Sequence, residues 1–380
     1  MSTPTPTPTP HVPSPSCPPA IASSELELHY LAEGAANIIY SVTVLSPQSQ
    51  NLQEHSHCCV MRLRKDLRST KPAVEVMADF ERRIAPLFTG QHESLLMTQS
   101  LYKLSPEMVR AATEELLEME HVDISSARST DLLVNMEGKP PRRGLRLRPH
   151  HRRHVYLPAY KDEQYGILMQ NLQGPGIDWL VEFKPKWLVQ SPSAPAGAKN
   201  CRTCALNAMR RKQQKHQGRG DSGFCPLDLL AVEGEGDLLE RALAKIWPSI
   251  EGEGEFLEFV AAFKKTVQPA LFHLQMLQEE HGSVGLNDFQ NPTGKDFGVA
   301  MALRDCSVFL ALRRKTQPGR GCIVELVDVK FADLDLKSME GGKIQKWATM
   351  EQELLDGRWY YSREDSDCSL SRIPSLNRKS

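Results

Sequence analysis

Two largely apolar runs in the last third of the chain, separated by a short turn-forming segment, constrain the fold more than any other feature. The first run covers residues 308–312 and the second covers residues 322–329, and the segment between them contains a proline and two glycines. Short apolar runs that end in turn-forming residues favour strands. The pattern predicts an antiparallel hairpin, in which Asp305 before the first strand and Asp333 after the second lie at the same end.

Two carboxylates that meet at one end of a hairpin could divide the work of phosphoryl transfer. One could accept the proton of the acceptor hydroxyl while the other holds Mg²⁺ on the nucleotide phosphates. An Asp-x-Asp motif such as Asp333-Leu334-Asp335 is common by chance. The motif indicates a functional site only because the predicted hairpin places it at the same end as Asp305.

Two segments of the chain contain basic residues and no acidic ones. Residues 183–220 hold nine lysines and arginines without an aspartate or glutamate, although the formal net charge of the whole chain is only −1. Clustered cations set up a focused field, so this segment predicts an anion site. For the arginine-rich segment, residues 139–160, a solvated loop and a functional site remain equal alternatives.

The N-terminal part of the chain predicts a tail followed by a small β-rich lobe. Residues 1–24 begin with a Thr/Pro-rich run that predicts a disordered tail. Residues 25–172 are expected to form a nucleotide-binding lobe with an arginine-rich insertion. Strands are expected at residues 28–31, 38–44, 59–65 and 165–172, and helices at residues 73–88 and 107–120.

The turn between the first two predicted strands consists of small residues, Gly34, Ala35, Ala36 and Asn37. Such a turn can lie over a triphosphate, because no large side chains keep the backbone away from it. Arg62 or Arg64 on the next strand could reach the phosphates. Most turns of this kind are plain hairpins, but its position upstream of the aspartate hairpin is the order expected of a two-lobed kinase.

The second half of the chain predicts a larger, more helical lobe. Helical spacing of apolar residues predicts helices over residues 237–247 and 255–280. With the hairpin, these helices are expected to make residues 173–360 a mixed C-terminal lobe. Residues 361–380 are expected to form a polar tail.

Cysteines in the basic segment leave two interpretations open. Cys201, Cys204, His216 and Cys225 have the residue types of a tetrahedral zinc site, although their spacing is not a standard one. Ordinary buried thiols are the alternative.

Five motifs along the chain, in this order, resemble the inositol-pentakisphosphate 2-kinase family: Glu182-Phe183-Lys184-Pro185-Lys186, Cys201-Arg202-Thr203-Cys204, Cys225-Pro226-Leu227-Asp228-Leu229, Asp305-Cys306-Ser307 and Asp333-Leu334-Asp335-Leu336-Lys337. The resemblance covers residues 26–350. It implies a two-lobed α+β fold of the inositol-phosphate-kinase kind. It also implies that ATP and Mg²⁺ are used to phosphorylate the 2-hydroxyl of inositol 1,3,4,5,6-pentakisphosphate, which gives phytic acid.

The resemblance also implies roles for particular residues. Asp305 would be the general base, with Lys184 beside it as a catalytic residue, and Asp333 would bind Mg²⁺. Substrate phosphates would be held by Lys184, Lys186, Arg210 and Lys337. The nucleotide would be held by Gly34, Ala35, Ala36, Asn37, Arg62 and Glu182. The basic residue and the tyrosine that many members have after the last motif are missing here, so Lys343 or Lys346 is expected to substitute.

Two other interpretations compete with a kinase. One is a non-catalytic basic module that binds RNA or phosphoinositide headgroups, and the other is a kinase-like scaffold that has lost activity. Aromatic residues make up only 7% of the chain and do not alternate with the basic residues as base stacking requires. The kinase interpretation is therefore preferred. It comes with the expectation of a monomer in the nucleus or cytoplasm, without membrane or direct nucleic-acid binding.

Overall fold

The computed structural model of the chain describes residues 21, 24–45, 57–121, 148–213, 223–232, 235, 237–247, 253–282, 284–290, 296–317, 321–337, 342–361 and 368–371. Most of the two tails predicted at residues 1–24 and 361–380 lies outside this part. Ile21 and Cys368 fall within those ranges and are nevertheless buried, so packed structure extends further than the sequence predicts. Within the described residues, no helix is both long enough and apolar enough to cross a membrane.

The chain divides into two compact units. The N-terminal unit consists of Cys17–Glu81 and Thr98–Gly174. The described residues of the C-terminal unit fall within Arg82–Met97 and Pro175–Ser380. Each unit combines helices with antiparallel strands, which confirms the α+β fold class. The assignment of nucleotide binding to the first of them stays a prediction.

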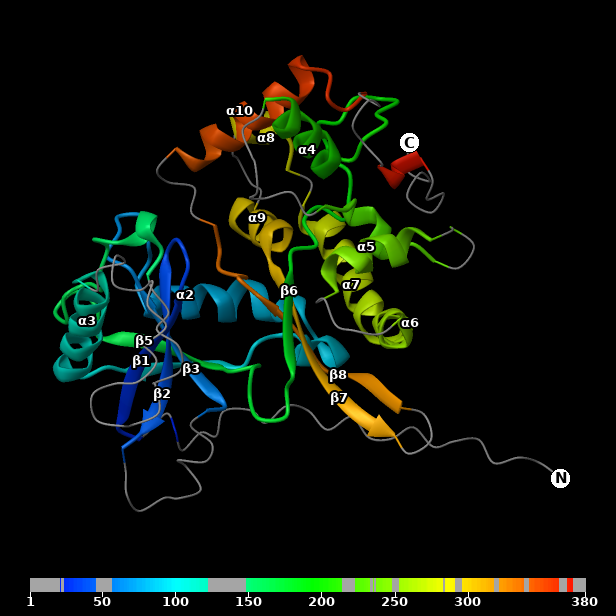
Figure 1. The fold of residues 1–380 in the computed structure, drawn as a ribbon. Helices are drawn as coiled ribbons and strands as arrows, with labels where there is room; N and C mark the ends of the chain where they lie inside the picture. The colour runs from blue at the N-terminus through cyan, green and yellow to red at the C-terminus, as the bar shows by residue number, and fades with distance from the viewer. Residues whose placement is uncertain are drawn as a thin grey trace. The chain divides into compact units, whose positions relative to one another are not determined.

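Five antiparallel strands form the sheet of the N-terminal unit, in the order β1-β2-β3-β5-β4 (Figure 1). They are β1 (Leu26–Glu33), β2 (Asn37–Val44), β3 (Cys59–Arg64), β4 (Gln99–Lys103) and β5 (Tyr165–Gln170). Buried residues alternate along β2, which is the pattern of a strand with one face against a core. The strands predicted from the sequence in this unit are thereby confirmed, and β4 is an additional one.

Two helices cover opposite faces of this sheet. Leu168 of β5 belongs to the core cluster that contains residues of α3 (Pro106–His121), whereas its neighbour Ile167 packs with residues of α2 (Ala73–Asp79). Successive side chains of a strand point to opposite faces, so the two helices lie on different sides.

Three antiparallel strands form the sheet of the C-terminal unit, in the order β6-β7-β8. They are β6 (Trp179–Phe183), β7 (Ser307–Gln317) and β8 (Gly321–Ala332). The last two make the hairpin predicted from the sequence, with Ser307 opposite Ala332. The edge strand β6, which the sequence analysis missed, pairs Phe183 with Val308.

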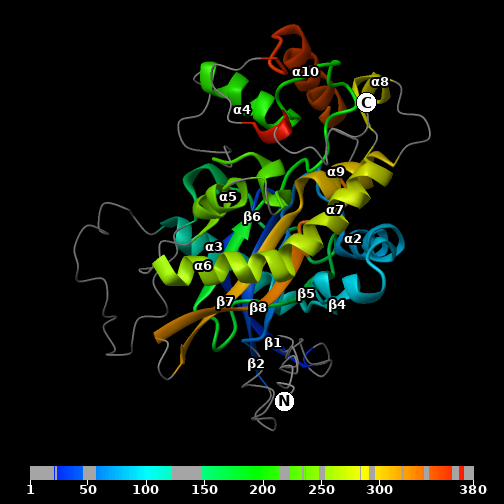
Figure 2. The same cartoon turned by 90° about the vertical axis from the view of Figure 1, so that its right-hand side faces the viewer.

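The helices of the C-terminal unit form two groups. Figure 2 shows α6 (Glu253–Ala262) lying across the hairpin, where it packs against β8. The chain continues from α6 into α7 (Gln268–His281), which packs against α9 (Phe297–Asp305), and α5 (Leu238–Ile246) contacts α6. The second group consists of α4 (Arg202–Lys212), α8 (Leu286–Gln290) and α10 (Lys343–Asp356), and α10 contacts both others (Figure 1).

Two predicted helices are present but interrupted. The helix predicted at residues 255–280 is α6 and α7 joined by a π-helical turn, Phe263–Val267. The one predicted at residues 73–88 continues from α2 through a π-helical turn into a short 3₁₀ turn. In each case a proline, Pro269 or Pro86, follows the π turn and lacks the N–H that a regular helix would use there.

Candidate active site

The hairpin brings Asp305 and Asp333 to the same end of the C-terminal sheet, as predicted. Asp305 is the last residue of α9, and Ser307 starts β7 two residues later. Asp333 directly follows β8, whose last residue Ala332 is the register partner of Ser307.

Two lysines reach these carboxylates from the end of β6. The Nζ atom of Lys184 donates to the backbone carbonyl of Asp305 at 2.7 Å and to Oδ2 of Asp333 at 2.8 Å. The Nζ atom of Lys186 donates to Oδ1 of Asp305 at 3.0 Å. The Glu-x-Lys-Pro-Lys motif therefore supplies two cations to the predicted catalytic end of the hairpin.

Lys337, the last residue of the motif that follows β8, contacts the same two carboxylates. Its Nζ atom lies 3.2 Å from Oδ1 of Asp333 and 3.6 Å from Oδ2 of Asp305. Three lysines and two aspartates thus form one group, the lysine–aspartate cluster: Lys184, Lys186, Lys337, Asp305 and Asp333. With both carboxylates ionised it carries one net positive charge, which suits it to an anionic ligand.

Contacts within the cluster shift the pKa values of Asp305 and Lys184. Burial alone would raise the pKa of Asp305, but Lys186, Lys337 and Lys184 outweigh it and hold that pKa below its usual value. Burial alone would lower the pKa of Lys184, but Asp333 and Asp305 outweigh it and hold that pKa above its usual value. At neutral pH the site therefore presents a carboxylate surrounded by ammonium groups.

Two residues of the cluster have left-handed backbone conformations. Lys186 and Asp333 each have a φ of 56°. Asn and Asp tolerate this region better than other L-residues, so Lys186 is the unusual one of the two, and such residues tend to gather at functional sites. The conformation turns the chain where it leaves β6 and β8, so both side chains return to the end of the hairpin.

A buried glutamine holds the two segments that carry Lys186 and Asp305. Gln278 of α7 is fully buried, and its Nε2 atom donates to the backbone carbonyls of Lys186 and Leu303, both at 2.9 Å. Its Oε1 atom accepts from the backbone N–H of Leu188 at 2.8 Å. Sequence analysis missed this residue, because one amide in a helix looks like ordinary polar surface.

The small-residue turn lies in the N-terminal unit and is closed by backbone bonds. The N–H of Gly34 donates to the carbonyl of Asn37 at 2.8 Å, and the N–H of Lys65 donates to the carbonyl of Ala36 at 2.9 Å. The Nζ atom of Lys65 donates to the carbonyl of Gly34 at 2.9 Å. The position of the turn is therefore fixed by Lys65, which follows β3.

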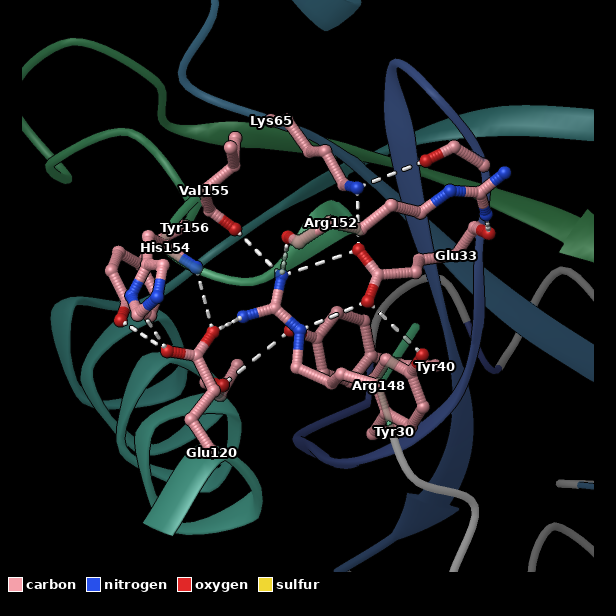
Figure 3. A network of polar contacts seen from close by, with 12 residues as sticks. Tyr30, Glu33, Tyr40, Lys65, Glu120, Arg148, Arg152, His154, Val155 and Tyr156 are labelled. Carbon is pink, nitrogen blue, oxygen red and sulfur yellow. Dashed lines mark hydrogen bonds and ion pairs between the residues drawn. The ribbon is translucent and has the colours of Figure 1, made fainter. Parts of the chain in front are cut away.

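Buried charges next to this turn belong to the network of polar contacts that Figure 3 shows. Glu33, directly before the turn, pairs with Lys65, and Arg148 donates to its two carboxylate oxygens at 2.9 and 3.2 Å. Arg148 also pairs with Glu120 of α3, and the side chains of Glu33 and Arg148 are fully buried. We call Glu33, Lys65, Glu120 and Arg148 the turn-supporting network.

The network gives part of the arginine-rich segment a structural role. Arg148 is among the largest fully buried side chains of the described residues, and Arg152 donates to the backbone carbonyl of Glu33. Arg148 is therefore not part of a solvated loop, which is one of the two alternatives drawn from the sequence. Residues 139–147 lie outside the described part of the chain.

Two comparisons with known proteins point to one family of kinases. A family model described as inositol-pentakisphosphate 2-kinase matches residues 30–271 and 265–353, which together make up most of the chain. The chain belongs to the inositol-pentakisphosphate 2-kinase family. An inositol-pentakisphosphate 2-kinase of Yarrowia lipolytica (strain CLIB 122 / E 150) is 31% identical over 231 residues, which cover 55% of this chain and 69% of that protein.

Membership of the inositol-pentakisphosphate 2-kinase family confirms the resemblance drawn from the five motifs. It identifies the chain as a kinase, a transferase of inositol phosphate metabolism. No observation favours the non-catalytic basic module. The lysine–aspartate cluster is built from three of the five motifs, which carry Lys184 and Lys186, Asp305, and Asp333 and Lys337.

The other predicted site residues lie on several elements outside the cluster. Glu182, on β6, accepts a hydrogen bond from Ser307 Oγ at 2.7 Å, next to the hairpin end. Arg210 is half-buried in the last turn of α4, and Lys343 is half-buried at the start of α10. In the N-terminal unit, Arg62 is half-buried on β3 opposite Ile39. The roles of these residues stay predictions.

The cysteines of the zinc hypothesis lie in the interior of the C-terminal unit. The sulfur atoms of Cys201, Cys204, Cys225 and Cys368 all lie within 4.8 Å of one another. His216, the other predicted ligand, lies outside the described residues. Three of the four predicted ligands therefore meet, and Cys368 completes a set of four soft donors of the kind that binds zinc.

Proposed function

We propose that this chain transfers the terminal phosphate of ATP to the 2-hydroxyl of inositol 1,3,4,5,6-pentakisphosphate, giving inositol hexakisphosphate (phytic acid). The observation that supports it best is the lysine–aspartate cluster, where three cations surround two carboxylates. A substrate with five phosphates needs several cations in one place, and transfer needs a carboxylate beside the acceptor hydroxyl. Membership of the family supports the same reaction.

Asp305 is the proposed general base. In the free protein its carboxylate is held by Lys186 and Lys337, and its lowered pKa makes it a weak base. Phosphates of the substrate would compete for these lysines and leave the carboxylate free to accept the proton of the 2-hydroxyl. Lys184, fixed by the backbone carbonyl of Asp305, would neutralise charge on the phosphoryl group during transfer.

Asp333 is the proposed ligand of Mg²⁺. Its carboxylate is exposed at the end of β8, with Asp335 two residues further on, and Mg²⁺ prefers such oxygen donors. Bound Mg²⁺ would neutralise charge on the nucleotide phosphates. Lys184 and Lys337, which contact Asp333 in the free protein, would then be available to the phosphates of the substrate.

The remaining assignments follow the predicted roles. We propose that the turn of Gly34, Ala35, Ala36 and Asn37, together with Arg62 and Glu182, binds ATP. Arg210 and Lys343 are proposed to add to the substrate-phosphate contacts of Lys186 and Lys337. A monomeric protein in the nucleus or cytoplasm remains part of the proposal.

The test is incubation of the purified full-length chain with Mg²⁺-ATP and inositol 1,3,4,5,6-pentakisphosphate, with products resolved by anion-exchange chromatography. We expect a hexakisphosphate product that is absent with Asp305→Asn. Calorimetry should show that this variant still binds the pentakisphosphate, because the substitution removes a negative charge and leaves the lysines in place. Absence of product from the unsubstituted chain would overturn the proposed reaction.

Asp178→Asn is a matched control for this experiment. Asp178 lies at the opposite end of the same sheet, where its carboxylate accepts from the backbone N–H of Arg314 at 2.7 Å. An asparagine oxygen can still accept that bond, so the control should keep full turnover. Unchanged turnover of Asp305→Asn would overturn the assignment of the base while leaving the proposed reaction intact.

A further inference from the structure

The indole ring of Trp187 contacts two buried arginines next to the lysine–aspartate cluster. The guanidinium carbon of Arg304 lies 3.6 Å from the centre of the ring, and that of Arg202 lies 4.4 Å from it. All three residues are buried. An aromatic face attracts guanidinium groups, most strongly when the ring is a tryptophan and water is excluded.

This contact joins the chain neighbours of two cluster residues. Trp187 directly follows Lys186, and Arg304 directly precedes Asp305. The Nζ atom of Lys186 donates to Oδ1 of Asp305 at 3.0 Å. The same two segments are therefore joined twice, once by the ion pair of the cluster and once by the ring and guanidinium group of the adjacent residues.

Arg304 forms no ion pair with a carboxylate of the described residues. Its terminal nitrogens donate to the backbone carbonyls of Val284, at 3.2 Å, and Gly282, while its Nε atom is buried without a hydrogen-bond partner. Burial and the charge of Arg202 lower the pKa of Arg304 to about 9, so the group is still protonated at neutral pH. A buried cation is costly unless it is compensated, and the ring of Trp187 supplies compensation that no carboxylate provides.

Arg202 is fixed by a buried carboxylate of α10. Its Nε atom donates to Oε2 of Glu351 at 3.0 Å. Glu351 also accepts from Ser191 Oγ and from the hydroxyl group of Tyr360, both at 2.6 Å. The second guanidinium group at the ring is therefore held in place, and the ring has little freedom to move.

We propose that Trp187 is a positioning residue of the active site, whose contact with Arg304 fixes the placement of Lys186 against Asp305. This role rests on the proposed function, in which Lys186 binds a substrate phosphate and Asp305 accepts the proton of the hydroxyl group. Trp187 is buried and acts through its neighbours rather than by touching the substrate. Reacting groups must be placed closely, since a displacement of about 1 Å can cost about 10²-fold in rate.

The first test measures the placement of Lys186 without using enzyme turnover. The full-length chain is labelled with an amine-reactive reagent, and the labelling rate of each lysine is followed by mass spectrometry. For Trp187→Leu we expect a several-fold higher rate at Lys186, because an ammonium group released from Asp305 loses its proton more easily. Lys315, which donates to Glu325 at 2.7 Å towards the other end of the hairpin, is the internal reference and should not change.

Trp179→Leu is the matched control for this measurement. Trp179 starts β6, and the guanidinium carbon of Arg314 lies 5.2 Å from the centre of its ring. The substitution removes an arginine–tryptophan contact at the opposite end of the same strand, so the labelling rate of Lys186 should stay at the wild-type value.

Trp187→Phe is a second variant that keeps an aromatic ring. The face of phenylalanine attracts cations more weakly than that of tryptophan. The labelling rate of Lys186 should therefore lie between those of wild type and Trp187→Leu. If Trp187→Leu does not fold, this variant decides alone, and a wild-type rate at Lys186 would overturn the proposal.

The second test is the division of the effect between kcat and KM. For Trp187→Leu we expect kcat to fall by about 10²-fold, with an unchanged KM for ATP and with unfolding temperatures measured alongside. Wild-type labelling of Lys186, unchanged kcat, or equal losses in Trp187→Leu and Trp179→Leu would each overturn the proposal. If the wild type makes no hexakisphosphate, the proposed reaction fails, but the labelling rates still decide the role of Trp187.

Discussion

Lys184 joins Asp333 through a 2.8 Å ion pair, and the same ammonium group donates to the backbone carbonyl of Asp305 at 2.7 Å. One side chain directly after the edge strand β6 thus connects Asp305, at the end of α9, to Asp333, the residue after β8. This contact ties the Glu-x-Lys-Pro-Lys motif to both proposed catalytic aspartates.

Loss of the Lys184 ammonium group should reduce turnover strongly. Removing one preorganised charge donor from a transition state costs about 10²-fold or more in kcat, so we expect a decrease of that order for Lys184→Met. Steady-state kinetics would measure it. Lys315→Met is the matched control, because Lys315 lies towards the other end of the same hairpin and pairs with Glu325 at 2.7 Å. Equal effects of the two substitutions would contradict the role of Lys184.

The acid limb of the pH–rate profile should move when a neighbouring lysine is removed. The pKa of Asp305 is lowered by its lysines against the effect of burial, with Lys186 foremost among them. Without that cation the pKa rises, so the base becomes protonated at a higher pH. For Lys186→Met we expect the acid limb of kcat/KM to shift upward, since this profile reports the free enzyme. An unmoved limb would argue against Asp305 as the titrating base.

Gln278→Met should lower both stability and turnover. The substitution leaves the carbonyls of Lys186 and Leu303 and the N–H of Leu188 without their buried partner. Each unsatisfied buried group costs about 1–3 kcal/mol, so thermal unfolding should occur at a clearly lower temperature. The lost support of Lys186 and Asp305 should also decrease kcat in enzyme that remains folded.

Gln268→Met separates these two effects. Gln268 lies on the same helix, is also buried, and donates to the carbonyls of Leu229 and Ala231 at 3.1 and 2.8 Å. We expect it to lower the unfolding temperature without a comparable decrease in kcat. If both substitutions reduce kcat equally, Gln278 stabilises the unit without positioning the site.

Gly34→Ala tests the proposed nucleotide turn without disturbing the fold. A Cβ atom at Gly34 would lie 3.8 Å from the carbonyl oxygen of Asn37, an ordinary contact, so the unfolding temperature should not change. If phosphates lie against this turn, the added methyl group should raise the KM for ATP. Gly174→Ala in the same unit is the control, with its nearest atom 3.9 Å away. Identical KM values for both variants would place the nucleotide elsewhere.

Arg148→Met should destabilise the N-terminal unit by about 3–5 kcal/mol, because it leaves Glu33 buried without its main partner. Burial alone would raise the pKa of Glu33, but Arg148 and Lys65 lower it. The stabilisation is therefore present above the unfolded-state pKa of a glutamate and is lost as the pH falls through the lower folded-state value. Urea unfolding at neutral and acid pH would show the difference between wild type and variant shrinking in acid.

Arg110→Met provides the comparison for an exposed ion pair. Arg110 bonds Glu114 one helical turn away on α3, and both side chains are more than half exposed. Such a pair contributes about 0.5 kcal/mol or less. A similarly small effect of Arg148→Met would mean that the buried network does not hold the turn.

The sequence was sufficient for features whose signals lie close together in the chain. Two runs around a turn predicted the hairpin, and the antiparallel pairing of Ser307 with Ala332 followed from it. The two runs therefore also place Asp305 and Asp333 at one end of the hairpin. The lysines of the cluster were found from the motifs of the family, because charge alone does not show which cations face a carboxylate.

Features that depend on distant contacts were missed. Gln278 meets Lys186 and Leu188 from about ninety residues away, and no local pattern indicates that its amide points inward. Arg148 was grouped with the arginine-rich segment, for which a solvated loop and a functional site were equal alternatives, because its partner Glu33 lies 115 residues earlier. Cys368 was assigned to a polar tail. Such contacts arise from packing, which residue periodicity does not encode.

The contact between Cys225 and Cys368 closes a loop of 143 residues. Both proposed catalytic aspartates, Asp305 and Asp333, lie inside it. During synthesis, Cys201, Cys204 and Cys225 emerge long before Cys368. The contact with Cys368 therefore cannot form until the hairpin has been made. Because contacts between residues far apart in sequence form slowly, the packing of Cys368 against Cys225 should be a late step in folding.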